Sequence, residues 1–261
     1  MSSPFIGSEA VARGLLTRGQ LRWNYTAIHP DVYVPNGSER TLDVHGASWV
    51  AAETPVELIG CARRRQPGVI VREERIAADE VVSMCDLLVT TPERTALDLA
   101  RHLPRSEALA RLDALAAATG IEPDASLGLA DRYRGARGVR RARAIAPLTD
   151  AGAQSPRESW LRLLLIDAGF PRPVTQIPVS DSYRRAFIDL GWDEPKIGLE
   201  YEGGHHQSDR AQFVWDIGRQ DLLEELGWLI IRVVKEHSRA YILQRVNDAF
   251  NRRRFPLARS A

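Results

Sequence analysis

The sequence predicts an α+β protein in two parts that meet near residue 150. Helix-length and strand-length apolar patterns occur in both parts, and those after residue 155 follow the order α-β-β-β-α-β-α. A stretch of small and polar residues, 150–155, lies between the parts. We therefore expect domains at 1–150 and 151–261, the second built on a mixed β-sheet flanked by helices.

Composition places the chain among ordinary globular proteins. It has 261 residues, 44% of them hydrophobic and 26% charged, and a formal net charge of +1. No apolar run approaches the ~18 residues of a membrane span, and residues 1–9 lack a signal-peptide pattern. Cys61 and Cys85 form neither a disulfide framework nor a metal-binding spacing. These features predict a cytoplasmic protein without a membrane partner.

The first 45 residues have the order of a small winged helix-turn-helix. Helical patterns cover 7–14 and 17–23, and a strand pattern covers 31–35. In such a module the second helix enters the major groove of DNA, so Arg18 and Arg22 would face phosphates or bases. The alternative is a solvated helix face, on which the same two arginines have no partner.

Between residues 46 and 150, short strand patterns are followed by helices. Strand-like stretches occur at 56–59, 68–71, 81–82 and 87–89, and Thr91 and Pro92 open a helix. Further helical patterns cover 96–102 and 107–119, and residues 132–143 then carry six arginines without an acid. Such a cluster can bind the phosphate backbone of DNA, and we assign Arg137, Arg140 and Arg141 to that role. A solvated linker helix is the alternative.

The part after residue 155 has the clearest pattern. Ser155 and Glu158 form a capping box for a helix at 155–168. Strands are expected at 174–179, 183–192, 197–202 and 228–234, with helices at 208–226 and 238–254.

Strand periodicity brings acidic side chains together. In strand 197–202, Glu200 and Glu202 point to the same face. A tight turn to the preceding strand makes Asp189 a near cross-strand neighbour of Glu200. Grouped carboxylates repel one another, and a hard divalent cation relieves the conflict. Mg²⁺ or Mn²⁺ at this place would suit phosphodiester hydrolysis, and His205 or His206 in the following turn could act as general base or acid.

These residues resemble a known nuclease group. Asp189, the run from Glu200 to His206, Asp216 with Arg219, and the run from Gly227 to Arg232 are similar to the very-short-patch-repair-like branch of the PD-(D/E)xK superfamily (domain of unknown function 559 type). Segments 15–21, 31–35 and 90–99 resemble AbiEi-type antitoxins, as in uncharacterised actinobacterial proteins that join both parts.

The resemblance implies a restriction-endonuclease-like fold and assigns roles to single residues. Asp189 and Glu200 would be the metal ligands, Glu158 would lie near the metal or its water, and His206 would be the imidazole of the turn. Glu202 departs from the pattern, since the superfamily has Lys and this branch usually has Asp there. Trp215 and Gly218 stand where basic residues are common, which leaves Arg219 as a DNA contact in this helix.

The functional hypothesis is therefore a Mg²⁺-dependent DNA endonuclease or nickase with catalytic residues Asp189, Glu200, Glu202, His206 and Glu158. The alternative is a non-cleaving DNA-binding regulator or antitoxin. A third possibility is a protein-interaction module that binds a toxin or another defence-system partner.

Overall fold

The computed structural model confirms an α+β fold. It describes residues 69–84, 87–202 and 210–256, and short stretches at 5–6, 10–11, 13–16, 20, 25–29, 32–35 and 56–59. For residues 210–216 only the backbone is described. By its contacts the chain divides into two compact units, Met1–Val89 and Thr90–Ala261. Within the described residues, no helix has the length and apolar character needed to cross a membrane.

The first unit is described mainly through its strands. β1 (Phe5–Ile6), β3 (Val32–Pro35) and β2 (Tyr25–His29) form an antiparallel sheet. Further pairs are formed by β4 (Val56–Ile59) with β5 (Val69–Arg72), and by β6 (Val81–Met84) with β7 (Leu87–Thr90). The strands expected from the sequence are thus present. Arg18 and Arg22 lie outside the described residues, as does most of the predicted helix-turn-helix.

The second unit begins with a helical layer. It contains α4 (Pro92–His102), α5 (Arg105–Thr119), α6 (Pro123–Arg132) and α7 (Val139–Ile145). The predicted threonine cap is present, because Thr91 Oγ1 accepts a hydrogen bond from the backbone N–H of Arg94 (3.3 Å). Small and aliphatic side chains of these helices form one buried cluster around Leu97, Leu109 and Ile145. α6 was not predicted from the sequence, since its few apolar residues give no clear helical period.

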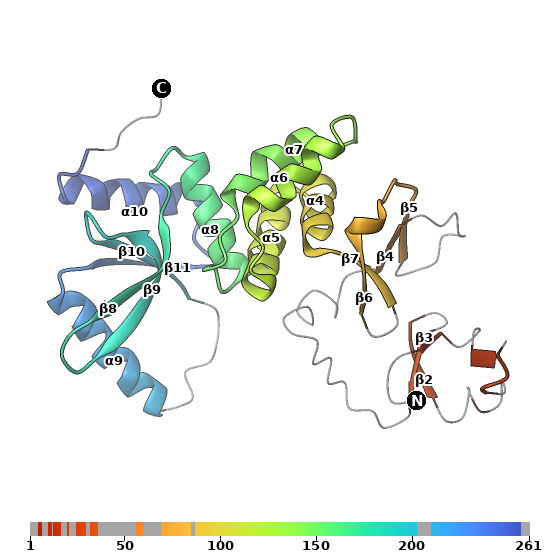
Figure 1. The fold of residues 1–261 in the computed structure, drawn as a ribbon. Coiled ribbons are helices and arrows are strands. Elements are labelled where there is room, and N and C mark those ends of the chain that lie inside the picture. The colour runs from red at the N-terminus through yellow and green to blue at the C-terminus, as the bar shows by residue number, and fades with distance from the viewer. Residues whose placement is uncertain are drawn as a thin grey trace. The chain divides into compact units, whose positions relative to one another are not determined.

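The C-terminal sheet follows the predicted order (Figure 1). After α8 (Pro156–Asp167) come β8 (Val174–Ser180), β9 (Arg185–Trp192), β10 (Ile197–Glu202), α9 (Arg210–Glu225), β11 (Leu229–Val234) and α10 (Arg239–Arg252). The sheet has the order β11-β10-β9-β8. β10 and β11 are parallel and the other two pairs are antiparallel, so the sheet is mixed as expected.

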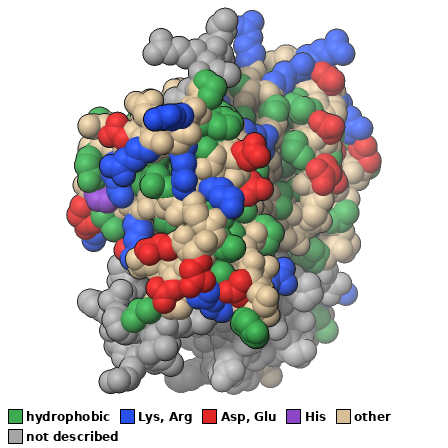
Figure 2. Space-filling model, turned by 90° about the vertical axis from the view of Figure 1, so that its left-hand side faces the viewer, with side chains coloured by type: hydrophobic (Ala, Val, Ile, Leu, Met, Phe, Trp, Pro, Cys, Tyr) green, Lys and Arg blue, Asp and Glu red, His purple; other side chains and the backbone are tan. Residues whose placement is uncertain are grey.

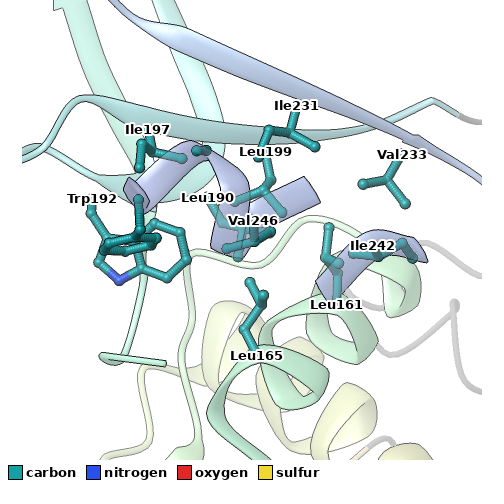
Figure 3. Packing of buried hydrophobic residues seen from close by; sticks show 12 residues of the cluster. Leu161, Leu165, Leu190, Trp192, Ile197, Leu199, Ile231, Val233, Ile242 and Val246 are labelled. Atoms are coloured by element: carbon teal, nitrogen blue, oxygen red, sulfur yellow. The ribbon is translucent and has the colours of Figure 1, made fainter. Parts of the chain in front are cut away.

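Helices cover both faces of this sheet. On one face, Leu161 and Leu165 of α8 and Ile242 and Val246 of α10 pack on the three strands β9, β10 and β11 (Figure 3). On the other face, Leu222 and Leu223 of α9 form a separate cluster with residues of β8 and β9. The middle parts of β9 and β10 are therefore buried between helices, whereas Arg185 and Glu202 at their adjoining ends are exposed.

A buried ion pair joins the helical layer to the sheet. Arg162 of α8 donates through Nη2 to Asp113 Oδ2 of α5 (2.7 Å), and both side chains are at least 99% buried. Asp113 also accepts from the backbone N–H of Asp150 (2.8 Å), and Arg162 from Nη1 donates to the Leu148 carbonyl (2.5 Å). These bonds cross the predicted boundary at 150, so residues on both sides of it belong to one packed unit. The division of the chain into domains 1–150 and 151–261 stays a prediction.

The surface drawn in Figure 2 carries both signs of charge. Lys and Arg side chains lie over its upper part with Asp and Glu side chains among them, and a further group of Asp and Glu side chains lies near its lower centre. Because the two signs are interspersed, this face has no extended basic field, in keeping with the net charge of +1.

Candidate functional site

Glu158 is held by the N-terminus of α8. Its Oε1 accepts from Ser155 Oγ (2.8 Å) and its Oε2 from the backbone N–H of Gln154 (2.9 Å). Ser155 Oγ in turn accepts from the backbone N–H of Glu158 (3.2 Å), which confirms the capping interaction between these two residues. Both oxygens of this buried carboxylate are therefore engaged in closing the helix end.

Asp189 lies where β9 and β10 separate. The last residue pair of their ladder is Leu190 with Leu199, and Asp189 Oδ2 accepts from the backbone N–H of Tyr201 (3.1 Å) just beyond it. The side-chain alternation of β9 is interrupted here, because Ile188 packs against α9 whereas Leu190 packs against α8 and α10. Asp189 thus occupies an irregular position in its strand, next to Glu200 as the hairpin predicted.

Glu200 is buried on the α9 side of β10. Arg219 Nη2 of α9 lies 2.6 Å from Glu200 Oε1 and also donates to the Phe187 carbonyl of β9 (2.7 Å). Glu200 Oε1 nevertheless has no partner with hydrogen-bond geometry within the described part of the chain. The charge of this carboxylate is compensated by Arg219, whose guanidinium lies in direct contact with Oε1.

The neighbouring carboxylates Glu158 and Glu200 affect the pKa of Asp189. Burial, the negative charge of Glu158 and that of Glu200 raise its pKa to about 6, although the Tyr201 N–H and Arg219 oppose the shift. Carboxylates that repel one another in a partly buried place are typical of cation-binding sites. Asp189 is therefore close enough to Glu158 and Glu200 to be repelled by both, while the metal site itself stays a prediction.

The grouping is looser than a preformed three-carboxylate metal site. The ligand oxygens of Glu158, Asp189 and Glu200 do not all lie within 4.8 Å of one another. Each carboxylate has a structural partner that accounts for this: the α8 cap for Glu158, Tyr201 for Asp189 and Arg219 for Glu200. Asp189 and Glu200 are the pair that a hard cation would contact, since Asp189 is destabilised as an anion and Glu200 lies next to it. The ion would have to displace Arg219 from Glu200 Oε1.

The other predicted site residues either have different partners or lie outside the residues that the structure describes. Glu202 is exposed at the end of β10, with Oε1 at 3.3 Å from Arg232 Nε of β11. His205 and His206 lie outside the described residues, and so does the side chain of Asp216. Arg219, which was predicted to contact DNA, forms an ion pair with Glu200 in the structure.

The arginines predicted to bind DNA differ in their surroundings. Arg137, Arg140 and Arg141 are all exposed. Arg141 donates through Nη2 to the Arg101 carbonyl, and Arg101 donates through Nε to the Arg137 carbonyl (3.0 Å). The Arg141 guanidinium therefore helps to fasten α7 to α4, whereas the side chains of Arg137 and Arg140 form no ion pair with a described acid.

Two contacts of the site were not predicted from the sequence. The first is the Arg219–Glu200 pair, which depends on how α9 crosses the sheet. The second is the bond from Tyr201 to Asp189, which depends on where the ladder of β9 and β10 ends. No sequence spacing encodes either feature, although the Asp216–Arg219 pattern did mark Arg219.

The raised pKa of Asp189 leads to a stability prediction. Between pH 4 and pH 6 the folded state binds a proton that the unfolded state releases, so stability falls as the pH rises through this window. Asp189→Asn removes the repulsion and keeps an oxygen for Tyr201. At pH 8 we expect it to raise the free energy of unfolding by about 2 kcal/mol, with little change at pH 4. Urea unfolding at both pH values measures this.

A carboxylate with the opposite shift provides the control. Asp181 accepts from the backbone N–H groups of Tyr183 (2.7 Å) and Arg184 (2.6 Å), which lower its pKa. Asp181→Asn should therefore reduce stability at pH 8. An equal gain from Asp189→Asn at pH 4 and pH 8 would show that charge repulsion is not the cause.

Comparison with known proteins relates part of the chain to antitoxins. Residues 44–148 match the family model of the AbiEi antitoxin C-terminal domain. The match covers less than half of the chain, and it leaves out the C-terminal sheet with its carboxylates. The resemblance to AbiEi-type antitoxins is thereby supported for this segment, while the resemblance to PD-(D/E)xK nucleases stays a prediction.

Two curated relatives are uncharacterised proteins of Mycobacterium tuberculosis, MT2308 of strain CDC 1551 / Oshkosh and Rv2248 of strain ATCC 25618 / H37Rv. Each is 34% identical to this chain over 153 residues, which are 58% of this chain and 56% of the relative. The chain thus spans about half the length of the curated relatives it matches. No solved structure matches the chain.

Proposed function

We propose that this chain is a DNA-associated regulator of the toxin–antitoxin type whose second unit carries a divalent-metal nuclease site. The antitoxin-like match over residues 44–148 supports the first part of the proposal. The second part rests on one observation: Asp189 lies beside Glu200 at the point where β9 and β10 separate, and the charge of Glu158 also acts on it. A divalent cation would relieve the repulsion between these carboxylates.

In this proposal Asp189 and Glu200 hold Mg²⁺ or Mn²⁺. When bound, the ion would lower the pKa of a coordinated water and would supply positive charge to the phosphoryl group. Glu158, held by the α8 cap on the other side of Asp189, keeps the local potential negative and thereby favours cation binding. Glu202, at the end of β10, and His206, four residues later in the sequence, would move protons between water and the leaving oxygen.

DNA is the proposed substrate and a toxin the proposed partner. Exposed arginines of the helical layer, Arg137 and Arg140, would contact phosphates, and the segment around Arg18 and Arg22 would position the protein on a duplex. The partner follows from the antitoxin-like match alone.

The test is cleavage of supercoiled plasmid in Mg²⁺ or Mn²⁺. Wild type should convert it to nicked or linear DNA, whereas Asp189→Asn and Glu200→Gln should be inactive and remain folded. The matched control is Asp181→Asn, which changes an exposed carboxylate in the β8–β9 turn. This variant should cleave like wild type. Equal cleavage by all four proteins would contradict the nuclease site.

A non-cleaving regulator is the second candidate function. The Arg219–Glu200 ion pair favours it, because an internal cation already compensates the buried carboxylate without a metal. This candidate predicts duplex binding that weakens steeply with salt and needs no metal. It also predicts no cleavage by wild type in any divalent ion, so the plasmid experiment separates the two.

A further inference from the structure

Arginines and aromatic rings alternate along one edge of the second unit, in an arrangement that the metal site does not use. The arginine–aromatic strip consists of Arg157, Trp160, Tyr201, His237, Arg239 and Tyr241. The Arg157 guanidinium lies over the Tyr201 ring (5.9 Å to its centroid) and that of Arg239 over the Trp160 ring (6.0 Å). His237 and Tyr241 meet edge to face, with centroids 4.9 Å apart.

The topology makes this strip continuous. Arg157 and Trp160 are three residues apart on α8 and so share a helix face. Tyr201 of β10 is paired in parallel register with Val233 of β11, so both strands end on the same side of the sheet. Beyond β11, the chain reaches His237, then the α10 cap Ser238, whose Oγ accepts from the backbone N–H of Tyr241 (3.2 Å).

The arginines of the strip contact aromatic rings but no described acid. Arg157 and Arg239 are exposed and form no ion pair with any acid in the described ranges. Both lie in the first turn of a helix, where the helix dipole disfavours a cation. Their positive charge is therefore available to an anion, and it costs helix stability when no anion is present.

The aromatic members offer apolar rings beside these charges. Tyr241 is 48% exposed, which is more than is usual for a tyrosine that packs in a hydrophobic core. Trp160 and Tyr201 are half-buried and pack on the core with one side. The guanidinium of Arg245 lies over the Tyr241 ring (5.6 Å to its centroid). A ring that is exposed beside guanidinium groups suits a ligand that combines phosphates with flat bases.

We propose that the strip binds an unpaired nucleic-acid strand, with phosphates at Arg157 and Arg239 and a base stacked on Tyr241. Bases inside a duplex do not present their faces, so stacking selects single strands or ends. The inference rests on the proposed function for its context, because Arg157 adjoins Glu158 and Tyr201 lies between Glu200 and Glu202. It names the form of nucleic acid that the second unit would bind.

The test is fluorescence anisotropy with a labelled oligo-dT of about 15 nucleotides, a length near the upper end of known single-strand sites. EDTA is present throughout, so that cleavage plays no part. Tyr241→Ala should weaken binding about 5- to 100-fold, the range seen for loss of one stacked base. Tyr241→Phe keeps the ring and should bind like wild type, which separates stacking from the phenol group.

Arg239→Gln and Arg252→Gln form the matched charge pair, since they change the same charge at opposite ends of α10. We expect only Arg239→Gln to weaken binding, by about tenfold. Equal loss in both variants, equal affinity for a duplex of the same length, or equal competition by polyglutamate would overturn the proposal. Because the binding experiment contains no metal, its result does not depend on whether the carboxylates form an active site. If the protein cleaves DNA but the strip variants bind like wild type, only the present inference is overturned.

Discussion

Asp113→Ala is expected to lower the free energy of unfolding by about 3–5 kcal/mol, the cost of breaking a buried ion pair. The substitution leaves the fully buried Arg162 guanidinium without its carboxylate, and its Nε already has no partner among described residues. It also removes the acceptor of the Asp150 N–H. Chemical denaturation followed by circular dichroism measures the loss.

A double variant is the control for this prediction. Asp113→Leu combined with Arg162→Met replaces both charges by apolar groups, so no buried charge is left unpaired. It should be markedly more stable than Asp113→Ala. If Asp113→Ala costs less than about 1 kcal/mol, as an exposed pair would, the pair does not join the helical layer to the sheet in solution.

The second large effect concerns metal affinity. Glu200→Gln is expected to weaken Mn²⁺ binding by at least about 100-fold, more than the loss of a residue that only supports a ligand. It removes a carboxylate that would bind the metal, and it leaves Arg219 near the site as an unbalanced positive charge. Isothermal titration of Mn²⁺ at pH 8 measures the affinity.

The same titration has a pH dependence with a defined sign. The metal competes with the proton on Asp189, whose pKa lies at about 6, so affinity should rise between pH 5 and pH 7 and level off above. Glu202→Gln is the matched control, since Glu202 is exposed and pairs with Arg232. A wild-type affinity that is independent of pH in this window would contradict a role of Asp189 as ligand.

Local sequence signals were sufficient for most elements of the second unit. The capping residues Thr91, Ser155 and Ser238 each stand where a helix begins, because their side-chain oxygens satisfy a free backbone N–H. Period-two alternation also placed Glu200 toward one face of β10 and Tyr201 toward the other, and their contacts with α9 and α8 agree.

Long-range polar contacts were beyond these signals. Asp113 and Arg162 are 49 residues apart, and each looks in the sequence like an ordinary charge on a helix. Their complete burial follows from the packing of α5 on α8. Arg219 likewise has the pattern of a surface arginine, and only the position of α9 over β10 makes it the counter-ion of Glu200.

Crystals of the protein soaked in Mn²⁺ and measured at the manganese absorption edge test the central claim most directly. The proposal predicts one anomalous peak within about 2.1–2.4 Å of oxygens from both Asp189 and Glu200, with the Arg219 guanidinium displaced from Glu200. A map without a peak at this pair, with the Arg219–Glu200 contact intact, would contradict a metal-dependent site.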